Sequence, residues 1–172
     1  MKTFSKKKFI LILIILFIVF AGVFIYQWWQ TKKELTEENI NWKTYRNEEW
    51  EFEFRYPENW SFHEDTFYSP FSKFNLAGAP IGERYQIDPP LLINIVTLDF
   101  ADSYVINMKN LGATTSDLIV GGIRGTKYEY IFESIPQVDI NLSLGEYLMI
   151  LGTKKQYEDI FNQILATFKF LE

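Results

Sequence analysis

The chain has 172 residues, which is enough for one ordinary domain and an additional short segment, and it contains no cysteine. The lack of cysteine excludes a disulfide framework, a thiolate metal site and a cysteine nucleophile. Four lysines lie within the first eight residues, so the remainder of the chain carries a net charge of about −9. Because phosphate backbones repel such a domain, we expect no nucleic-acid binding.

The first predicted element is a single transmembrane helix over residues 9–29, preceded by a basic cytoplasmic tail at 1–8. Residues 9–26 read FILILIILFIVFAGVFIY without a charge, and at about 1.5 Å per residue a helix of this length matches a bilayer's hydrocarbon core. Trp28 and Trp29 would lie at the far membrane interface, while the lysines hold the near end in the cytoplasm. We therefore expect a single-pass cell-membrane protein that contacts the lipid bilayer through residues 9–29 and has its C-terminal domain outside.

A cleaved signal peptide is the alternative interpretation of this segment, since a basic start followed by an apolar run fits both. The apolar run exceeds the ~7 to 15 residues usual for a signal peptide. No small-residue cleavage site follows it, because Tyr26, Trp28 and Trp29 are bulky. A pilin-type anchor also fits poorly, since the run contains no acidic residue.

The next segment, residues 30–41, is polar and rich in lysine and glutamate, which is typical of an exposed juxtamembrane linker. A folded domain is expected over residues 42–172. Its first clear strand signal is the alternation of aromatic and charged residues from Trp50 to Tyr56, which buries one face and exposes the other. The sequence Pro57-Glu58-Asn59 predicts a turn after it.

Apolar runs bounded by turn-forming residues predict seven more strands. They are Ser61–His63, Phe71–Leu76, Leu91–Leu98, Asp117–Val120, Ile123–Phe132, Asp139–Leu142 and Glu146–Leu151. Two helices are predicted from apolar residues that share one face, the first over Ala101–Asn110 and the second over Lys155–Ala166. Antiparallel strands with two helices define an α+β domain, in which the second helix should cover a sheet.

Two terminal motifs resemble the small membrane-anchored PsbP-like proteins of bacteria. They are the segment from Trp42 to Trp60, which contains WKTYRN and WEFEFRYPENW, and FNQILATFKF at 161–170. The resemblance implies an antiparallel β-sheet flanked by helices, with Phe168 and Phe170 in a last edge strand. Photosynthetic members act as extrinsic assembly or stabilising subunits, and a eukaryotic relative binds a small GTPase. Neither role attaches to a residue that matches here.

The sequence His63-Glu64-Asp65 is the only place where an imidazole and carboxylates cluster, and it is the weak candidate for a metal or acid/base site. The alternative interpretation is structural, because neighbours in a strand point to opposite faces and a closed metal site needs three or four convergent ligands. We therefore expect no bound metal and no cofactor.

The glycine-rich segment Gly121–Lys127 superficially resembles a phosphate-binding loop. Its glycine spacing does not match the P-loop pattern, and a strand rather than a helix is predicted to follow. A hairpin turn with glycine at positive φ is the preferred interpretation.

The aromatic segment 67–90 is the candidate partner surface. It places the aromatic side chains of Tyr68, Phe71, Phe74 and Tyr85 among four prolines and two glycines. Long aromatic loops on a rigid sheet often carry recognition surfaces. The alternative is that these rings cap the core.

These observations predict a membrane-tethered extracytoplasmic binding or assembly module without catalytic activity, whose partner at the membrane is an unidentified protein. With one histidine and no cysteine, the usual pairs of nucleophile and base are nearly exhausted. The alternative is a metal-dependent ligand binder or enzyme that uses His63 and the nearby carboxylates.

Overall fold

The computed structural model describes residues 41–64, 71–83 and 89–171, which belong to one compact unit. Among these residues no helix has the length and apolar character needed to cross a bilayer. The predicted transmembrane helix at 9–29, with Trp28 and Trp29, lies outside the described residues, as does the predicted linker at 30–41 except for its last residue, Asn41.

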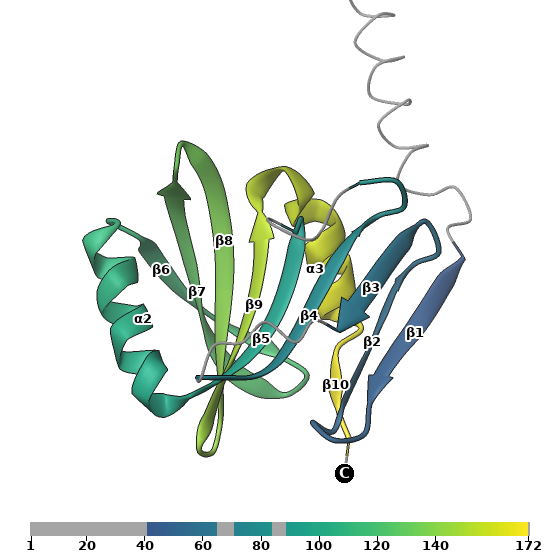
Figure 1. Cartoon of the computed structure of the whole chain (residues 1–172), viewed down its shortest axis with the longest axis horizontal. Coiled ribbons are helices and arrows are strands. Elements are labelled where there is room, and N and C mark those ends of the chain that lie inside the picture. The colour runs from purple at the N-terminus through teal and green to yellow at the C-terminus, as the bar shows by residue number, and fades with distance from the viewer. Residues whose placement is uncertain (1–40, 65–70, 84–88, 172) are drawn as a thin grey trace, which may run out of the picture. The chain divides into compact units, whose positions relative to one another are not determined.

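The described residues form ten strands, two α-helices and one short 3₁₀-helix (Figure 1). In chain order they are β1 (Trp42–Asn47), β2 (Phe52–Pro57), β3 (Trp60–Glu64), β4 (Ser72–Pro80), β5 (Leu91–Thr97), α2 (Leu98–Asn110), β6 (Thr114–Val120), β7 (Ile123–Phe132), β8 (Ile135–Leu144), β9 (Tyr147–Lys154), η1 (Lys155–Tyr157), α3 (Glu158–Ala166) and β10 (Lys169–Phe170).

The strands form two antiparallel sheets. The larger sheet has seven strands in the order β3-β4-β5-β9-β8-β7-β6, and the smaller has three in the order β1-β2-β10. Hairpins join β6 to β7, β7 to β8 and β8 to β9, so this half of the large sheet is built from neighbours in sequence. The helix α2 connects β5 to β6. These two strands lie on opposite sides of the β9-β8-β7 group in the large sheet.

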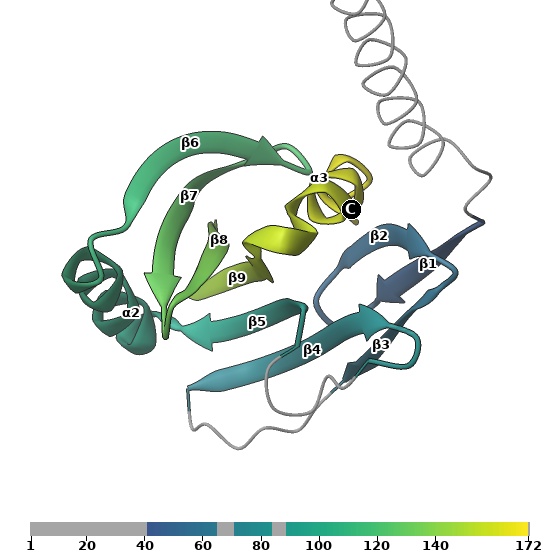
Figure 2. The same ribbon diagram turned by 90° about the horizontal axis from the view of Figure 1, so that it is seen from above.

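One face of the seven-stranded sheet, which we call the core face, is covered by α3 and the small sheet (Figure 2). Phe52 and Phe54 of β2 are completely buried because strand alternation directs both inward. Both rings stack on Phe168, with centroid distances of 5.3 and 5.8 Å. Phe161 and Ile164 of α3 are buried in the same cluster.

The opposite face, which we call the α2 face, carries a smaller apolar cluster. Val96, Leu148 and Ile150 pack there against partly buried side chains of α2, including Phe100 and Tyr104. This helix covers only part of the face, because it makes contacts chiefly with β5 and β9.

The predicted α+β class with antiparallel strands and two helices is confirmed in outline, although the described domain is mostly β. The expectation of one sheet flanked by helices is incomplete, because there is a second, three-stranded sheet, which covers the core face together with α3. No strand was predicted at Trp42–Asn47, where β1 pairs with β2. The predicted last edge strand is confirmed as β10, which contains Phe170 but not Phe168 and pairs with the other side of β2.

The glycine-rich segment Gly121–Lys127 contains a hairpin turn, as its preferred interpretation predicted. Gly121 and Gly122 connect β6 to β7 with φ values of +56° and +89°, the left-handed region that glycine adopts without a steric penalty. The helix α3 begins later than predicted, because Lys155–Tyr157 is a 3₁₀ turn.

Candidate functional site

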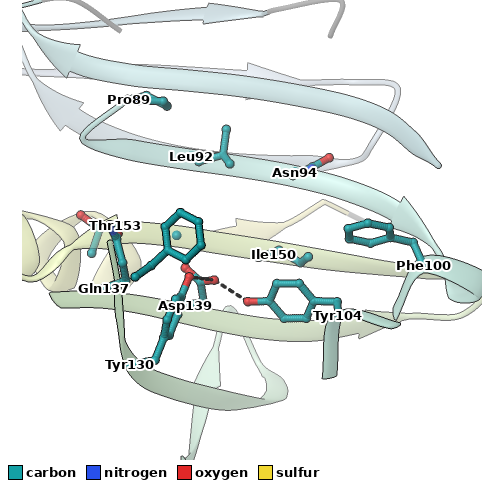
Figure 3. Close-up of a pocket in the computed structure, with 12 residues that line it drawn as sticks. Pro89, Leu92, Asn94, Phe100, Tyr104, Tyr130, Gln137, Asp139, Ile150 and Thr153 are labelled. Atoms are coloured by element: carbon teal, nitrogen blue, oxygen red, sulfur yellow. Dashed lines mark hydrogen bonds between the residues drawn. The ribbon is translucent and has the colours of Figure 1, made fainter. Parts of the chain in front are cut away.

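A cavity of about 270 Å³ lies between α2 and the α2 face of the large sheet (Figure 3). Its floor comes from strands β5, β9 and β8, which contribute Leu92, Ile150 and Asp139. Phe100 and Tyr104 of α2 form one wall, and Tyr130 and Phe132 of β7 form another. We refer to this space as the α2 cavity.

Strand alternation explains why an acidic side chain lies at the cavity floor. Val138, Ile140 and Leu142 of β8 face the core and are almost completely buried. Asp139 and Asn141 alternate with them, so their side chains must emerge on the α2 face. The strand β8 is therefore apolar on one face and polar but still buried on the other.

Asp139 is only 8% exposed, and two tyrosine hydroxyl groups donate hydrogen bonds to its Oδ2 atom. One comes from Tyr104 on α2 and the other from Tyr130 on β7, at 2.8 Å for Tyr130. Figure 3 shows the two rings reaching the carboxylate from different directions. The carboxylate is thus held by elements on two sides of the cavity.

Gly152 of β9 makes room for this carboxylate. It pairs with Asp139 across the β8-β9 ladder. A Cβ atom at Gly152 would lie 2.7 Å from Oδ1 of Asp139, well inside van der Waals contact. Any larger residue would therefore displace the acid from its present position.

Burial raises the pKa of Asp139, while the hydrogen bonds from the two tyrosines oppose that rise. Burial also raises the pKa of Tyr104 and of Tyr130 above the usual range, and the neighbouring carboxylate adds to the effect. Within the described residues, no basic side chain lies at ion-pair distance from Asp139. The ionised acid would be a buried negative charge balanced by hydroxyl groups alone.

Other polar groups lie on the α2 face beside the acid. The Ser72 hydroxyl donates to Oδ1 of Asn94, a cavity residue, at 2.8 Å. The side-chain oxygen of Asn141 is buried and accepts no hydrogen bond within the described part of the chain. Buried polar atoms usually have a protein or water partner, so this oxygen is a further sign that the face is not purely structural.

Neither phenol of this site is available as a base. Both phenols remain protonated at neutral pH because their pKa values are raised, so they cannot serve as bases. Their hydroxyl groups are also directed at Asp139 instead of at the open space. The cavity offers a fixed acceptor surrounded by aromatic rings.

A second cluster of charges lies away from the cavity and serves the fold. Lys127 of β7 contacts Glu158 at 2.6 Å, and Lys155 contacts the same carboxylate at 2.8 Å. Glu129 completes the group by pairing with both lysines. The pKa of Glu158 is lowered by these lysines in spite of its burial. This network attaches the start of α3 to the sheet.

His63 and Glu64, members of the predicted metal candidate, are exposed residues of the edge strand β3. They point to opposite faces, and Glu64 accepts a hydrogen bond from the Tyr45 hydroxyl. Asp65 lies outside the described residues. Within residues 41–64, 71–83 and 89–171, no three histidine, aspartate or glutamate side chains come together as metal ligands would.

The predicted partner surface is divided by the structure. Phe74 lies in β4 and packs edge-on against the core residue Phe52, with ring centroids 5.9 Å apart, so it belongs to the core. Phe71 is 42% exposed and stacks on Phe100 of α2. Tyr68 and Tyr85 lie outside the described residues. The strand predicted over Phe71–Leu76 corresponds to β4, so this part of the aromatic segment is a strand and not a loop.

The sequence analysis missed the cavity and its central acid. Asp139 was placed at the start of a strand, and Tyr104 was used only as part of a helix face. One local signal was present, because Asp139 and Asn141 alternate with three aliphatic residues in VDINL, a segment otherwise typical of a buried strand. A buried acid in such a segment needs hydrogen-bond partners, but the sequence does not say which residues supply them.

No family model and no curated protein matches this sequence. The similar solved structures include a cyanobacterial PsbP from Synechocystis sp. PCC 6803, at 11% identity with a TM-score of 0.47, covering 78% of this chain and 95% of that one. A protein from Bacteroides thetaiotaomicron is 12% identical with a TM-score of 0.42, covering 76% of this chain and 48% of its own. LpqN, involved in cell envelope biogenesis of Mycobacterium tuberculosis, is 14% identical with a TM-score of 0.39, covering 78% and 88%.

Membership of the PsbP-like family stays a prediction. At these identities and TM-scores no residue role is carried over to this chain.

Proposed function

We propose that this protein is a membrane-tethered extracytoplasmic binding or assembly module without catalytic activity, and that the α2 cavity is its binding site. The observation that carries the proposal is the position of Asp139, a buried acid at the floor of a cavity, held by two hydroxyl groups and paired with no base among the described residues. A buried charge of this kind is costly to a fold that does not use it.

The composition of the cavity supports binding of a small molecule. Small-molecule sites are concave and mostly apolar, with a few polar groups that fix orientation. The α2 cavity combines four aromatic residues with one carboxylate and the amides of Asn94 and Gln137. The tether and the extracytoplasmic location rest on the uncharged run at 9–26 and the lysines before it. A protein partner at the membrane belongs to the same proposal.

Native mass spectrometry of the full chain, purified in dodecyl maltoside from the membranes in which it was made, tests the binding function. We expect a small molecule bound in a 1:1 ratio. Leu92→Trp should abolish that species, because Leu92 lines the cavity and is only half-buried. A wild-type chain that carries no small molecule, or an adduct that persists in Leu92→Trp, would contradict the proposal.

Ile106→Trp is the matched control for this experiment. Ile106 lies on α2, is 58% exposed and does not line the cavity. A tryptophan there adds the same bulk at a surface position, so we expect the bound species to be retained. Loss of the adduct in both variants would place the binding site elsewhere.

The alternative of a metal-dependent binder or enzyme at His63 has no supporting geometry within the described residues, because His63 and Glu64 diverge. Elemental analysis of the purified chain tests it directly. Stoichiometric metal that is lost in His63→Ala would favour this alternative over the binding module.

A further inference from the structure

We propose that the ligand of the α2 cavity is a small organic cation, whose positive group faces Asp139 and whose apolar substituents lie against the rings of Phe100, Tyr104, Tyr130 and Phe132. This inference rests on the proposed binding function and specifies the chemistry of its ligand.

The first step of the argument is the sign of the charge. Among the described residues that line the cavity, Asp139 is the only carboxylate, and none is a lysine, arginine or histidine. Both hydrogen bonds reach Oδ2, and neither reaches Oδ1. When Asp139 is ionised, a neutral or anionic ligand would leave its buried charge uncompensated, whereas a cation would balance that charge and favour the ionised form.

The second step is the chemistry of the walls. Phe100 and Tyr104 are neighbours on α2, with ring centroids 6.3 Å apart. Tyr130 and Phe132 approach from β7, where both occupy positions on the α2 face of that strand. Aromatic faces attract cations through their quadrupoles, and sites for quaternary ammonium groups combine several such rings. The two walls thus complement a cation that has apolar substituents.

The third step separates an organic cation from a bare metal ion. Ca²⁺ requires six to eight oxygen ligands, and Mg²⁺ keeps an octahedral shell. Among its described lining residues the cavity supplies one carboxylate and the amide oxygens of Asn94 and Gln137, and both phenol hydroxyl groups already donate to the carboxylate. Ring carbons cannot replace the missing oxygens, so a bare divalent ion is disfavoured.

The size of the cavity agrees with this class of ligand. Its volume of about 270 Å³ lies just under the ~300 to 1,000 Å³ usual for sites that hold drug-sized molecules. A compact ammonium compound of a few carbons fits such a space, whereas a peptide or a polymer does not.

Choline and its uncharged isostere 3,3-dimethylbutan-1-ol are the probes that isolate the effect of charge, because they share shape and differ in one atom. Each is titrated by saturation-transfer NMR against the full chain in dodecyl maltoside, a detergent without a choline group. We expect choline to bind at least about tenfold more tightly than the alcohol, a ratio that one favourable charge interaction supplies.

Asp139→Asn should remove most of this preference, leaving the part that the aromatic rings supply, and should leave the affinity for the alcohol unchanged, since the amide keeps the size of the side chain. Asp117→Asn is the control, because Asp117 lies exposed on β6 and its loss changes the net charge equally. Equal effects of the two variants would overturn the inference by showing that overall charge attracts choline.

A second pair of variants tests the walls and does not disturb the buried acid. Phe132 is 49% exposed and lines the cavity, while Ile131 is 63% exposed on the other side of the same strand. Phe132→Ala should weaken choline binding at least about threefold through the loss of a cation–π contact, whereas Ile131→Ala should not. Retention of full affinity in Phe132→Ala would contradict the aromatic site.

The outcomes separate a failure of the proposed ligand class from a failure of the proposed binding function. If 3,3-dimethylbutan-1-ol binds as tightly as choline, the cation inference is overturned, but the cavity is still a binding site. Calcium chloride that displaces choline at equal concentration would overturn it in favour of a metal ion. If neither probe binds while native mass spectrometry still shows an adduct sensitive to Leu92→Trp, the organic-cation class is wrong and the binding function stands.

Discussion

At the scale of single residues, the most consequential feature is an acid where the surrounding sequence would favour an aliphatic side chain. Asp139 lies between two core residues of β8 and is itself buried. Two tyrosine hydroxyl groups donate hydrogen bonds to its carboxylate, and the absence of a side chain at Gly152 leaves room for it. Each of these features accommodates a charge that makes the fold less stable, which is the pattern expected of a functional group.

Asp139→Asn should change the pH dependence of stability. Because burial raises the pKa in the folded state, the native protein holds the proton more tightly than the unfolded chain, and stability must fall as pH rises between the two pKa values. The titratable groups that face the acid are Tyr104 on α2 and Tyr128 and Tyr130 on β7. Burial raises the pKa values of Tyr104 and Tyr130, so these two stay protonated in this range.

Unfolding of the full chain in detergent at pH 4 to 8 measures this effect. We expect the wild type to lose stability relative to Asp139→Asn from about pH 4 upward, by at most ~1.4 kcal/mol per pH unit. Asp117→Asn should follow the wild type. A constant difference between wild type and Asp139→Asn across this range would show that the acid does not titrate with folding.

Two phenylalanines of the proposed partner surface should now behave differently. Phe74→Ser should lower the free energy of unfolding by about 2 kcal/mol or more, because Phe74 packs on the core residue Phe52. Phe71→Ser should cost much less, since Phe71 is 42% exposed. Thermal unfolding of the two variants measures the difference. Equal losses of stability would show that Phe71 also belongs to the core.

At the scale of elements, β8 and α3 serve different purposes. The strand β8 contributes Val138, Ile140 and Leu142 to the core face and Asp139 to the cavity, so one strand links stability to the site. The helix α3 has no part in the cavity. Its apolar side chains cover the core face, and its first turn is attached to β7 through Glu158.

Phe161→Ala should be severely destabilising because Phe161 is 1% exposed at the centre of the surface that α3 buries. Truncation of a buried phenylalanine costs ~3 to 5 kcal/mol, a large part of the ~5 to 15 kcal/mol available to a domain. Asn162→Ala, at the next and exposed position, should change stability by less than ~0.5 kcal/mol. Chemical denaturation of the two variants compares them, and equal midpoints would contradict the packing of α3.

At the scale of the whole molecule, the acidic charge of the domain and its predicted membrane tether both bear on which ligands the domain meets. The predicted domain at 42–172 has 11 basic and 19 acidic residues, and its net charge of −8 attracts small cations and repels phosphate backbones. A tether would keep this domain near one membrane surface, where a ligand or partner could be presented. The charge of the domain and the carboxylate in the cavity thus favour the same class of ligand.

The predicted topology is tested by fusion and by mass. A reporter that is active only outside the cytoplasm should function when it is fused after Glu172, because the basic tail at 1–8 holds the N-terminus inside. Intact-mass measurement should find residues 1–29 retained. A cytoplasmically active reporter would reverse the orientation, and loss of about 25 residues would establish a cleaved signal peptide.

The sequence by itself determined the elements whose signal is local. Alternation in the Trp50–Tyr56 segment predicted a strand that the structure has as β2, the stripe around Phe161 predicted α3, and Gly121-Gly122 predicted a hairpin. These signals depend on neighbours a few residues away, so no tertiary information is needed. The strand β1 was missed because its burial pattern is mixed and its only partner is β2.

The tertiary structure alone decided where the site lies. Tyr104 is 35 residues before Asp139, and it meets the acid only because α2 crosses from β5 to β6 over the face of the strands between them. Gly152 reaches the same carboxylate through the β8-β9 register. Hydrophobic periodicity specifies which side chains leave the core face, but it contains no information about which of them then meet, since that depends on strand order and on the crossing of one helix.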